Sequence, residues 1–415
     1  MEILVIAAII IGLYMAWNIG ANDAANSMAD AVGSGALSLF WAIVLAGICE
    51  FAGAVLVGSH VTDTLRKGII ESQTFADNPM VLAHGMVCAM LGAAVWLNCA
   101  SYFGMPVSTT HSIVGAVLGF GLLEAGLASI YWDKMGQIVA SWFISPVAGG
   151  ILSFIGFKLI SRYILSVDKP ATAARKGIPI CVFITFTIII LSTIYKGLKN
   201  LHLDLSGPKA LGLSVAGGLV AAVLSLVLIR KSSNNHGDKP REEQLRQVEK
   251  VFAVLVIITS CTVAFAHGAN DVANAIGPLA AVVEIVKEKA IVEENIPVPL
   301  WLLVLGGIGM VLGIAMFGYR VMRVVGTEVT EITPSRGVAA DLATMVTVLT
   351  CSKMGLPIST THTLVGAILG IGMARGLTAI NRKVVKSIFT SWFATVPAAA
   401  GLTIVFYLLG KWLIW

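Results

Sequence analysis

The sequence predicts an all-α polytopic membrane protein with about 12 transmembrane segments, arranged in two inverted repeats with broken or re-entrant helices. Hydrophobic residues make up 57% of the 415 positions and charged residues only 12%, whereas soluble domains carry roughly 25% charged residues. Apolar runs of about 18 or more residues recur from end to end, and each is long enough to cross a bilayer. Two motifs also occur twice in the same order, which predicts the repeat.

Twelve apolar segments are suited to crossing a membrane. The segments that begin at Pro106 and Pro357 each follow a Gly-x-Pro break, so each is a candidate for a re-entrant half-helix instead of a full crossing. The twelve segments lie near residues 3–19, 37–58, 80–100, 106–125, 137–161, 178–195, 211–229, 251–267, 299–319, 337–352, 357–374 and 386–410.

The longest polar stretch, residues 230–250, predicts a cytoplasmic loop because Lys and Arg accumulate on the cytoplasmic side of membrane proteins. Counting crossings outward from that loop places Arg336 inside and both termini outside. The same count places Arg375 and residues 382–386 outside, against the positive-inside rule. We therefore expect a multi-pass protein of the cell (plasma) membrane, with residues 230–250 cytoplasmic and the termini extracellular.

An internal repeat organises the chain. The stretch "GANDAANSMADAVG" at 20–33 recurs as "GANDVANAIGPLAAV" at 268–282. The stretch "GMPVSTTHSIVGAVLGFG" at 104–121 recurs as "GLPISTTHTLVGAILGIG" at 355–372, with 12 of 18 positions identical. Seven crossings precede the second copy in this count, and an odd number gives the copies opposite orientations. Secondary transporters built from inverted repeats place their site at the repeat interface near the midplane.

The repeat predicts four parts of the chain. They are a first inverted repeat at 1–165, two connecting transmembrane helices at 166–229, the cytoplasmic loop at 230–250 and a second inverted repeat at 251–415.

The Asn-Asp motif of each copy predicts a cation site inside the membrane. Residues three or four apart share a face of a helix, and we expect Gly20 and Gly268 to break the helix and free backbone carbonyls. Carboxylate, amide and carbonyl oxygens together suit a small hard cation. The alternative is simple helix capping, but two intramembrane acids at matching places are costly without a role. The candidate sodium ligands are Asp23, Asn26, Asp271 and Asn274.

The Pro-x-Ser-Thr-Thr-His motif predicts an anion site. Pro106 and Pro357 suit the first turn of a helix, where backbone N–H groups have no helical partner. Free N–H groups, hydroxyl groups and the positive end of the helix dipole favour an oxyanion. Two such helix starts, approaching from opposite sides, would clamp one tetrahedral anion. The triplets concerned are Ser108, Thr109 and Thr110 in the first copy and Ser359, Thr360 and Thr361 in the second.

Four further polar residues have two open interpretations. His111 and His362 either donate to the anion or hold the hairpin by bonding a backbone carbonyl. Glu50 and Asp341 are either ion ligands or polar groups that pack helices together.

Combined, the motifs predict cation-coupled anion symport. Carboxylates would repel an anion in a low-dielectric site, so cations must bind near Asp23 and Asp271 first, or protons must neutralise them. An anion channel is the rival from another class, although neither motif contains the Lys or Arg that such pores usually use. A hydrolase with Ser108 as nucleophile and His111 as base is a weaker alternative, because that chemistry has no use for a second copy of the motif. We expect no enzyme activity, no cofactor besides sodium as coupling ion, and no nucleic-acid partner.

The motifs, in this order, closely resemble the duplicated signature of the inorganic phosphate transporter (PiT) family. The resemblance implies phosphate as substrate, twelve helices, cation coupling and a homodimer in the lipid bilayer. Eukaryotic relatives use sodium, many bacterial ones use protons or carry metal–phosphate complexes, and some move sulfate. Matching positions imply phosphate binding by Asn22, Asp23, Ser108, Thr109, Thr110, Asn270, Asp271, Ser359, Thr360 and Thr361.

Two departures from the family pattern bear on the prediction. The chain has only about 20 residues where eukaryotic members carry a long cytoplasmic loop, which indicates a bacterial or archaeal origin. Asp341 stands where eukaryotic members resemble one another in having Glu, and Met86 stands where several of them have another Glu. We predict a prokaryotic sodium/phosphate symporter that imports phosphate, with a proton-coupled phosphate or sulfate permease as the alternative.

Overall fold

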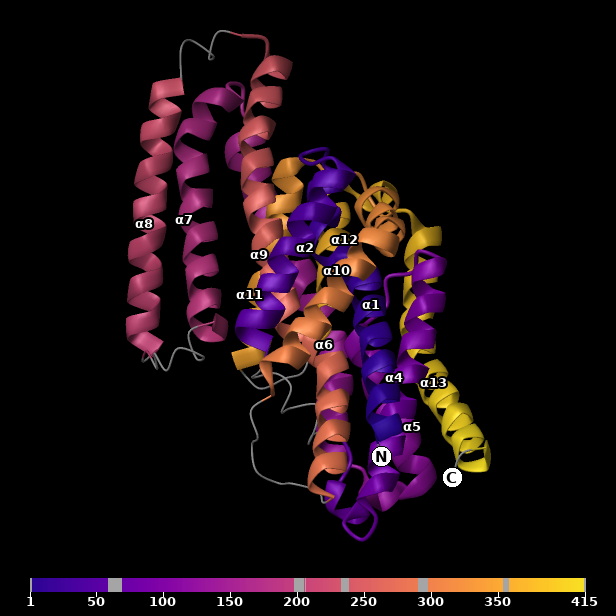
Figure 1. Cartoon of the computed structure of the whole chain (residues 1–415). Helices are drawn as coiled ribbons and strands as arrows, with labels where there is room; N and C mark the ends of the chain where they lie inside the picture. The colour runs from indigo at the N-terminus through magenta and orange to yellow at the C-terminus, as the bar shows by residue number, and fades with distance from the viewer. Residues whose placement is uncertain are drawn as a thin grey trace.

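The computed structural model describes residues 2–58, 69–197, 205, 207–232, 239–289, 298–353 and 358–413. These residues form twelve α-helices and no strand, which confirms the all-α fold class (Figure 1). The helices are α1 (Glu2–Gly33), α2 (Leu39–Val57), α4 (Pro79–Tyr102), α5 (Thr109–Glu124), α6 (Trp132–Ile160), α7 (Pro170–Gly197), α8 (Gly207–Ser232), α9 (Arg241–Glu288), α10 (Leu300–Arg323), α11 (Pro334–Lys353), α12 (Thr360–Arg375) and α13 (Arg382–Leu413).

Nine of the described helices are long and apolar enough to cross a membrane, so the protein is a multi-pass membrane protein. The helices α5 and α12 are not among them. Each has 16 residues and is therefore about 24 Å long, short of a hydrocarbon core of roughly 30 Å. Each packs against the longer helix before it, α4 or α11. These two hairpins are the re-entrant elements predicted at 106–125 and 357–374.

Arg375 and Arg336 lie at the same end of the molecule, because both contact the Glu331 carboxylate. The Oε2 atom of Glu331 is 2.6 Å from Arg375 Nη2 and 3.5 Å from Arg336 Nη1. The prediction that Arg375 lies across the membrane from Arg336 is therefore wrong, because the α11–α12 hairpin returns to the end from which it starts. The α4–α5 hairpin of the first copy also begins and ends on one side, because the Tyr131 N–H, after α5, donates to the Ile69 carbonyl, before α4, at 3.2 Å. This hairpin therefore leaves the odd parity of the count unchanged.

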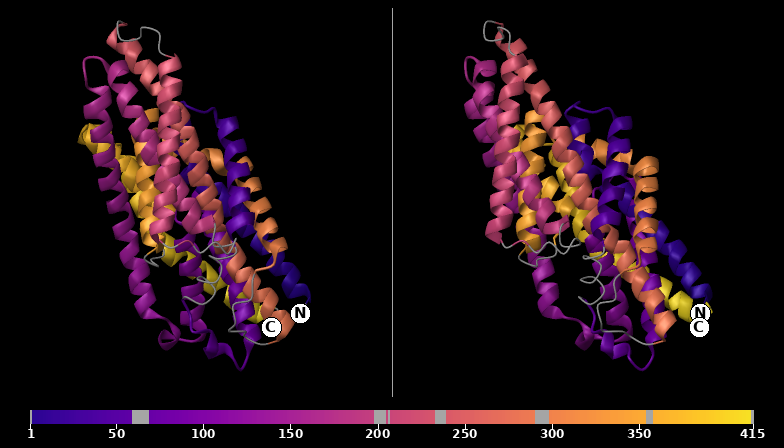
Figure 2. Two further views of the ribbon diagram at one scale, coloured as in Figure 1. Left: turned by 90° about the vertical axis from the view of Figure 1, so that its left-hand side faces the viewer. Right: turned by 60° about the vertical axis from the view of Figure 1, so that its left-hand side comes forward.

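The two Asn-Asp motifs lie on α1 and α9, which run in opposite directions through the middle of the molecule (Figures 1 and 2). Both helices are continuous: α1 passes through Gly20 and the 48-residue α9 passes through Gly268. The prediction that these glycines break their helices is therefore wrong. The opposite directions of α1 and α9 agree with inverted repeats, whose exact boundaries stay a prediction.

The glycines of the Asn-Asp motif instead allow two pairs of helices to cross closely. A Cβ atom on Gly20 would overlap the Met310 carbonyl of α10, and one on Gly268 would overlap the Glu50 carbonyl of α2. Met310 and Glu50 occupy equivalent positions in the repeated segments "LGGIGMVLG" and "LAGICEFAG". The two crossings are thus reciprocal, and small residues let backbones approach in lipid. This packing fixes α1 and α9 relative to each other through α2 and α10.

Gly20→Ala and Gly268→Ala are each expected to destabilise the protein, because the added methyl group meets backbone that cannot rotate away. Overpacking of this kind costs about 3 kcal/mol. The matched control is Gly401→Ala in α13, where an added Cβ has nothing within 4 Å. Thermal unfolding of the purified variants in detergent measures the difference. Unfolding of Gly20→Ala at the temperature of the control would contradict the crossing described here.

The helices α7 and α8 form a pair at the left-hand edge of the molecule in Figure 1. Among the described elements, α8 packs mainly on α7, and α7 joins the pair to α9. Much of α8 carries exposed Leu and Val side chains, as expected of a lipid-facing helix.

Candidate functional site

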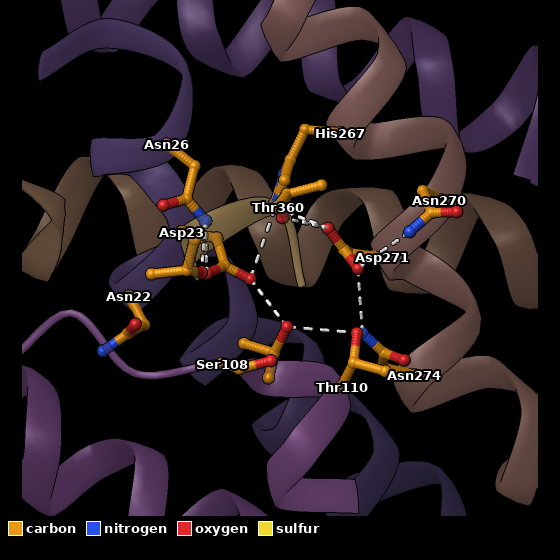
Figure 3. Close-up of polar contacts among 12 residues, drawn as sticks. Asn22, Asp23, Asn26, Ser108, Thr110, His267, Asn270, Asp271, Asn274 and Thr360 are labelled. Carbon is orange, nitrogen blue, oxygen red and sulfur yellow. Dashed lines mark hydrogen bonds and ion pairs between the residues drawn. The ribbon is translucent and has the colours of Figure 1, made fainter. Parts of the chain in front are cut away.

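The N-termini of the half-helices α5 and α12 meet between α1 and α9 (Figure 3). Ser108 is the N-cap of α5, since its Oγ accepts a hydrogen bond of 3.2 Å from the His111 backbone N–H. Ser359 caps α12 with the equivalent bond of 3.1 Å. Pro106 therefore precedes the cap, and the prediction that it forms the first helical turn is wrong; Pro357 lies outside the described residues. The Oγ atom of each serine therefore accepts a capping hydrogen bond from the start of its own helix.

Asp23 joins the two copies of the repeat. Its Oδ2 accepts a hydrogen bond of 2.8 Å from the Thr109 hydroxyl of α5. Its Oδ1 accepts bonds from the Asn26 amide at 2.8 Å and from the Thr361 hydroxyl of α12 at 3.3 Å. The Asn26 amide also donates to Thr361 Oγ1 at 2.8 Å. One carboxylate on α1 thus contacts the starts of both half-helices.

Asp271 has the equivalent surroundings on α9. Its Oδ1 accepts from the amides of Asn274 at 3.0 Å and Asn270 at 3.2 Å, and its Oδ2 accepts from the Thr360 hydroxyl at 3.4 Å. The Asn274 amide also lies 3.4 Å from Thr110 Oγ1 in the other copy. The structure therefore brings together the predicted cation ligands and the predicted anion ligands, which come from four separate helices (Figure 3).

His267 completes the centre of the site and was missed by the sequence analysis. Its Nε2 lies 2.6 Å from Asp271 Oδ2 and 3.3 Å from Asp23 Oδ2, and its Nδ1 lies 3.6 Å from Glu50 Oε1. The equivalent position of the first copy is Ile19, so a comparison of the repeats draws no attention to it. The available signal was a histidine inside an apolar run, one helical turn before Asp271, which places both on one face.

Glu50 belongs to the same buried cluster. Its Oε1 accepts a hydrogen bond of 3.1 Å from the Ser27 hydroxyl and faces the His267 ring. Ligand atoms of Asp23, His267 and Asp271 all lie within 4.8 Å of one another, a spacing that suits a bound cation. All these side chains are at most 2% exposed, so their charges interact through a low-dielectric medium and not through water.

Asn22 holds the linker between α4 and α5. Its Nδ2 donates to Ser101 Oγ and to the Met105 carbonyl, both at 3.1 Å, and its Oδ1 accepts from the Val107 N–H at 3.1 Å. In Figure 3 its amide points away from the other labelled side chains. The predicted contact of Asn22 with the anion stays a prediction, and the structure gives this residue a second task in placing α5.

Asn22→Ala is expected to loosen the α4–α5 linker, because three hydrogen bonds to residues 101–107 are lost at once. Backbone amides of this segment should exchange with deuterium at least about tenfold faster, as a loss of about 1.4 kcal/mol implies. Asn18→Ala is the matched control, since Asn18 on the same helix donates to the Tyr14 carbonyl within α1. Unchanged exchange at 101–107 in Asn22→Ala, measured by mass spectrometry, would contradict this role.

The rings of His111 and His362 pack against each other and against two tryptophans. The centroids of their two rings are 4.4 Å apart. The ring of His111 lies 4.2 Å from that of Trp142, and the ring of His362 lies 3.7 Å from that of Trp392. This packing decides between neither of the two interpretations, donation to the anion or a bond to a backbone carbonyl, and both stay predictions. Asp341 is outside the central cluster and contacts Thr259.

Comparison with known proteins decides the family. The sequence matches the phosphate transporter family over residues 19–403. The chain belongs to this family. Proteins of this family are transporters and not enzymes.

Individual relatives of the phosphate transporter family match nearly the whole chain. A candidate phosphate permease of Pyrococcus abyssi is 44% identical over 96% of both chains. The chloroplastic inorganic phosphate transporter 2-1 of Arabidopsis thaliana is 40% identical over 98% of this chain and 72% of its own length. Among solved structures, "the sodium-dependent phosphate transporter" is 41% identical and superimposes with a TM-score of 0.88, covering 99% of this chain and 100% of that one.

Proposed function

We propose that this protein imports inorganic phosphate by sodium-coupled symport, through one site between the N-termini of α5 and α12. The observation that carries the proposal is the meeting of both aspartates with both Ser-Thr-Thr triplets in one buried cluster. In this proposal Asp23 and Asp271, with Asn26 and Asn274, hold sodium. The triplets and the helix N-termini hold phosphate.

Charge explains why the two ions must travel together. Two buried carboxylates repel a phosphate anion strongly in a low-dielectric site, so phosphate binding needs a cation beside them. Helix N-termini and hydroxyl groups favour the anion. The 41% identity to a sodium-dependent phosphate transporter supports sodium as that cation.

The threonine hydroxyls are suited to both ions. Thr109 and Thr361 donate to Asp23 in this structure. A hydroxyl group has one donor and two acceptor lone pairs and rotates freely. The same oxygen atoms can therefore accept toward sodium or donate toward phosphate, without movement of the helix that carries them.

Phosphate is favoured over sulfate by the carboxylates near the anion site. Phosphate carries a proton at neutral pH and donates it in a hydrogen bond to an acceptor such as Asp23 or Asp271. Sulfate has no proton to donate at this pH. A site that surrounds its anion with both donors and acceptors therefore discriminates between the two.

Proton-coupled transport is the second candidate, and His267 is the observation that favours it. An imidazole changes its charge near neutral pH, and this one contacts both aspartates. Protons on the His267–aspartate cluster would offset the repulsion in place of sodium.

We further propose that the protein lies in the plasma membrane as a homodimer, with residues 230–250 cytoplasmic and the termini outside. The re-entrant α11–α12 hairpin places Arg375 with Arg336 at the end where α9 begins. Clustering of basic residues at one end supports the cytoplasmic assignment of that end. Mass photometry of the purified protein tests the dimer.

Uptake of radiolabelled phosphate into proteoliposomes tests the proposed function. Inward sodium and inward proton gradients are imposed separately, and unlabelled sulfate is added as a competitor. We expect accumulation with a sodium gradient alone and no inhibition by sulfate. Accumulation driven only by protons would replace sodium with the proton, and displacement of phosphate by sulfate would contradict the substrate assignment.

A further inference from the structure

We propose that a groove between α6, α7 and α11 binds one acyl chain of an anionic phospholipid, whose headgroup is held by Arg162 and Lys176. The groove shares no lining residue with the site between α5 and α12. The inference therefore does not depend on the proposed transport of phosphate.

The groove is apolar and open to its surroundings. Its volume is about 410 Å³, within the range of about 300–1,000 Å³ typical of ligand sites. Leu, Ile, Val, Ala and Gly line it, together with Cys181 and, at one end, Tyr163. Among the lining side chains, Leu159, Ile180 and Ile184 are between 43% and 59% exposed. The protein leaves these side chains uncovered, and in a membrane a hydrocarbon chain covers them.

The length of the groove matches one leaflet of a bilayer. The groove extends from Gly177 to Ile188 on α7 and from Leu152 to Tyr163 on α6. Each stretch advances eleven positions along its helix, which is about 16 Å at a rise of about 1.5 Å per residue. One half of a hydrocarbon core of roughly 30 Å has about this length. A single extended acyl chain therefore fits the groove.

The groove exists because α7 meets the end of α6 closely at only one place. There an added Cβ atom on Gly177 would lie 2.5 Å from Ile164 Cδ1, in the turn that follows α6. Among the described elements, α7 otherwise packs mainly on α8 and α9. The contact at Gly177 closes this end of the groove, so an acyl chain enters from the side and its headgroup lies beyond Tyr163.

Basic side chains flank this closed end. Arg162 directly precedes Tyr163, Lys176 directly precedes Gly177, and both are exposed. The Arg162 guanidinium carbon lies 5.8 Å from the centroid of the Tyr163 ring. Lys176 shares a helix face with Ile180, four residues later. Within the described part of the chain, neither basic side chain takes part in an ion pair.

Charge complementarity identifies the occupant as an anionic lipid. Residues 158–176 carry five basic side chains and a single acid, Asp168. Lys and Arg close to a membrane surface attract anionic headgroups, and Tyr side chains lie at headgroup level. The two parts of one phospholipid, its acyl chain and its phosphate, thus meet adjoining parts of the protein that match them. A zwitterionic headgroup gains much less from the same basic residues.

A lipid in this groove would fasten the α7–α8 pair to the rest of the molecule. Among the described elements, α8 packs mainly on α7, so the pair depends on few contacts with α6 and α11. A ligand that binds only the folded protein stabilises it. We therefore expect phosphatidylglycerol to raise the unfolding temperature of the purified protein more than phosphatidylcholine does.

Native mass spectrometry of the purified full-length protein tests the proposal, with phosphatidylglycerol and phosphatidylcholine of identical acyl chains as probes. We expect the wild type to bind phosphatidylglycerol at least about tenfold more tightly, as two basic contacts imply. Arg162→Gln/Lys176→Gln should bind the two lipids alike. The charge-matched control is Lys134→Gln/Lys209→Gln, exposed at the other end of α6 and at the start of α8. Equal affinities of the wild type for both lipids would overturn the proposal.

A second variant tests the groove itself. An added Cβ atom on Gly156, which lines the groove, meets only Ala339 Cβ at 3.9 Å. Gly156→Leu therefore fits the fold, fills the groove and should weaken binding of both lipids at least about tenfold. The control is Gly136→Leu on the same helix, where an added Cβ atom has nothing within 4 Å.

The outcomes of the Gly156→Leu experiment separate the possible occupants. Binding of phosphatidylglycerol at the wild-type affinity would show that no acyl chain enters the groove, and would overturn the proposal. A dimer that dissociates in Gly156→Leu while lipid binding is unchanged would assign the groove to a second copy of the chain. Size-exclusion profiles confirm folding of each variant. Sodium and phosphate are absent from these measurements, so failure of the proposed transport leaves the results interpretable.

Discussion

Asp23→Asn and Asp271→Asn are each expected to reduce sodium-driven phosphate accumulation by about a hundredfold or more. Removing one charge from a buried, paired cluster costs about 3–5 kcal/mol, and each 1.4 kcal/mol is a tenfold change in affinity. Both carboxylates are at most 1% exposed and contact the half-helix starts. The initial rate of phosphate uptake into proteoliposomes, measured across sodium concentrations, reports the loss.

The Asp→Asn variants distinguish a role of the carboxylate in ion binding from a role in folding. Asn keeps the size of Asp, so protein that remains monodisperse and yet fails to accumulate phosphate has lost the charge and not the fold. Asp133→Asn on the surface of α6 should transport at the wild-type rate. Normal accumulation by either buried variant would show that its carboxylate holds no coupling ion.

His267→Ala is expected to produce the second-largest effect, on both stability and transport. The imidazole lies between Asp23, Asp271 and Glu50, so its removal leaves three buried carboxyl groups facing one another. Loss of one member of such a cluster costs about 3–5 kcal/mol. We expect a lower unfolding temperature in sodium-free buffer and phosphate uptake below about a tenth of the wild-type rate.

Two further variants test the His267 prediction. His267→Gln keeps an amide donor near Asp271 and should recover part of the lost stability. His84→Ala, at a half-buried position of α4 outside the site, is the control. If His267→Ala unfolds and transports as the wild type does, the ring makes no energetic contribution to the cluster.

Much of the central site could be predicted from the sequence because helix periodicity and the repeat restrict it strongly. Asp23 and Asn26 share a helix face at any helix orientation, and the structure shows their hydrogen bond of 2.8 Å. The Ser-Thr-Thr triplets were expected at helix starts, and α5 and α12 begin there. Duplication of both motifs indicated that the two sets meet.

Other features could not be predicted because they depend on packing between distant helices. A glycine before a polar motif can either break its helix or let a second helix pack closely against it. Only the close approach of the Met310 carbonyl to Gly20 shows that the second explanation holds here. His267 has no counterpart in the first copy, so the repeat conceals it. Asp30 lies inside the repeated Asn-Asp motif, and the sequence does not indicate its interaction with Asp341, 311 positions later.

The most direct test of the central claim is a crystal structure with arsenate, a tetrahedral phosphate analogue whose arsenic atom scatters anomalously, in sodium-containing buffer. The account predicts one anomalous peak between the N-termini of α5 and α12, within hydrogen-bonding distance of hydroxyls from both Ser-Thr-Thr triplets. An arsenate peak elsewhere, with none beside Thr109 or Thr360, would contradict the proposed site.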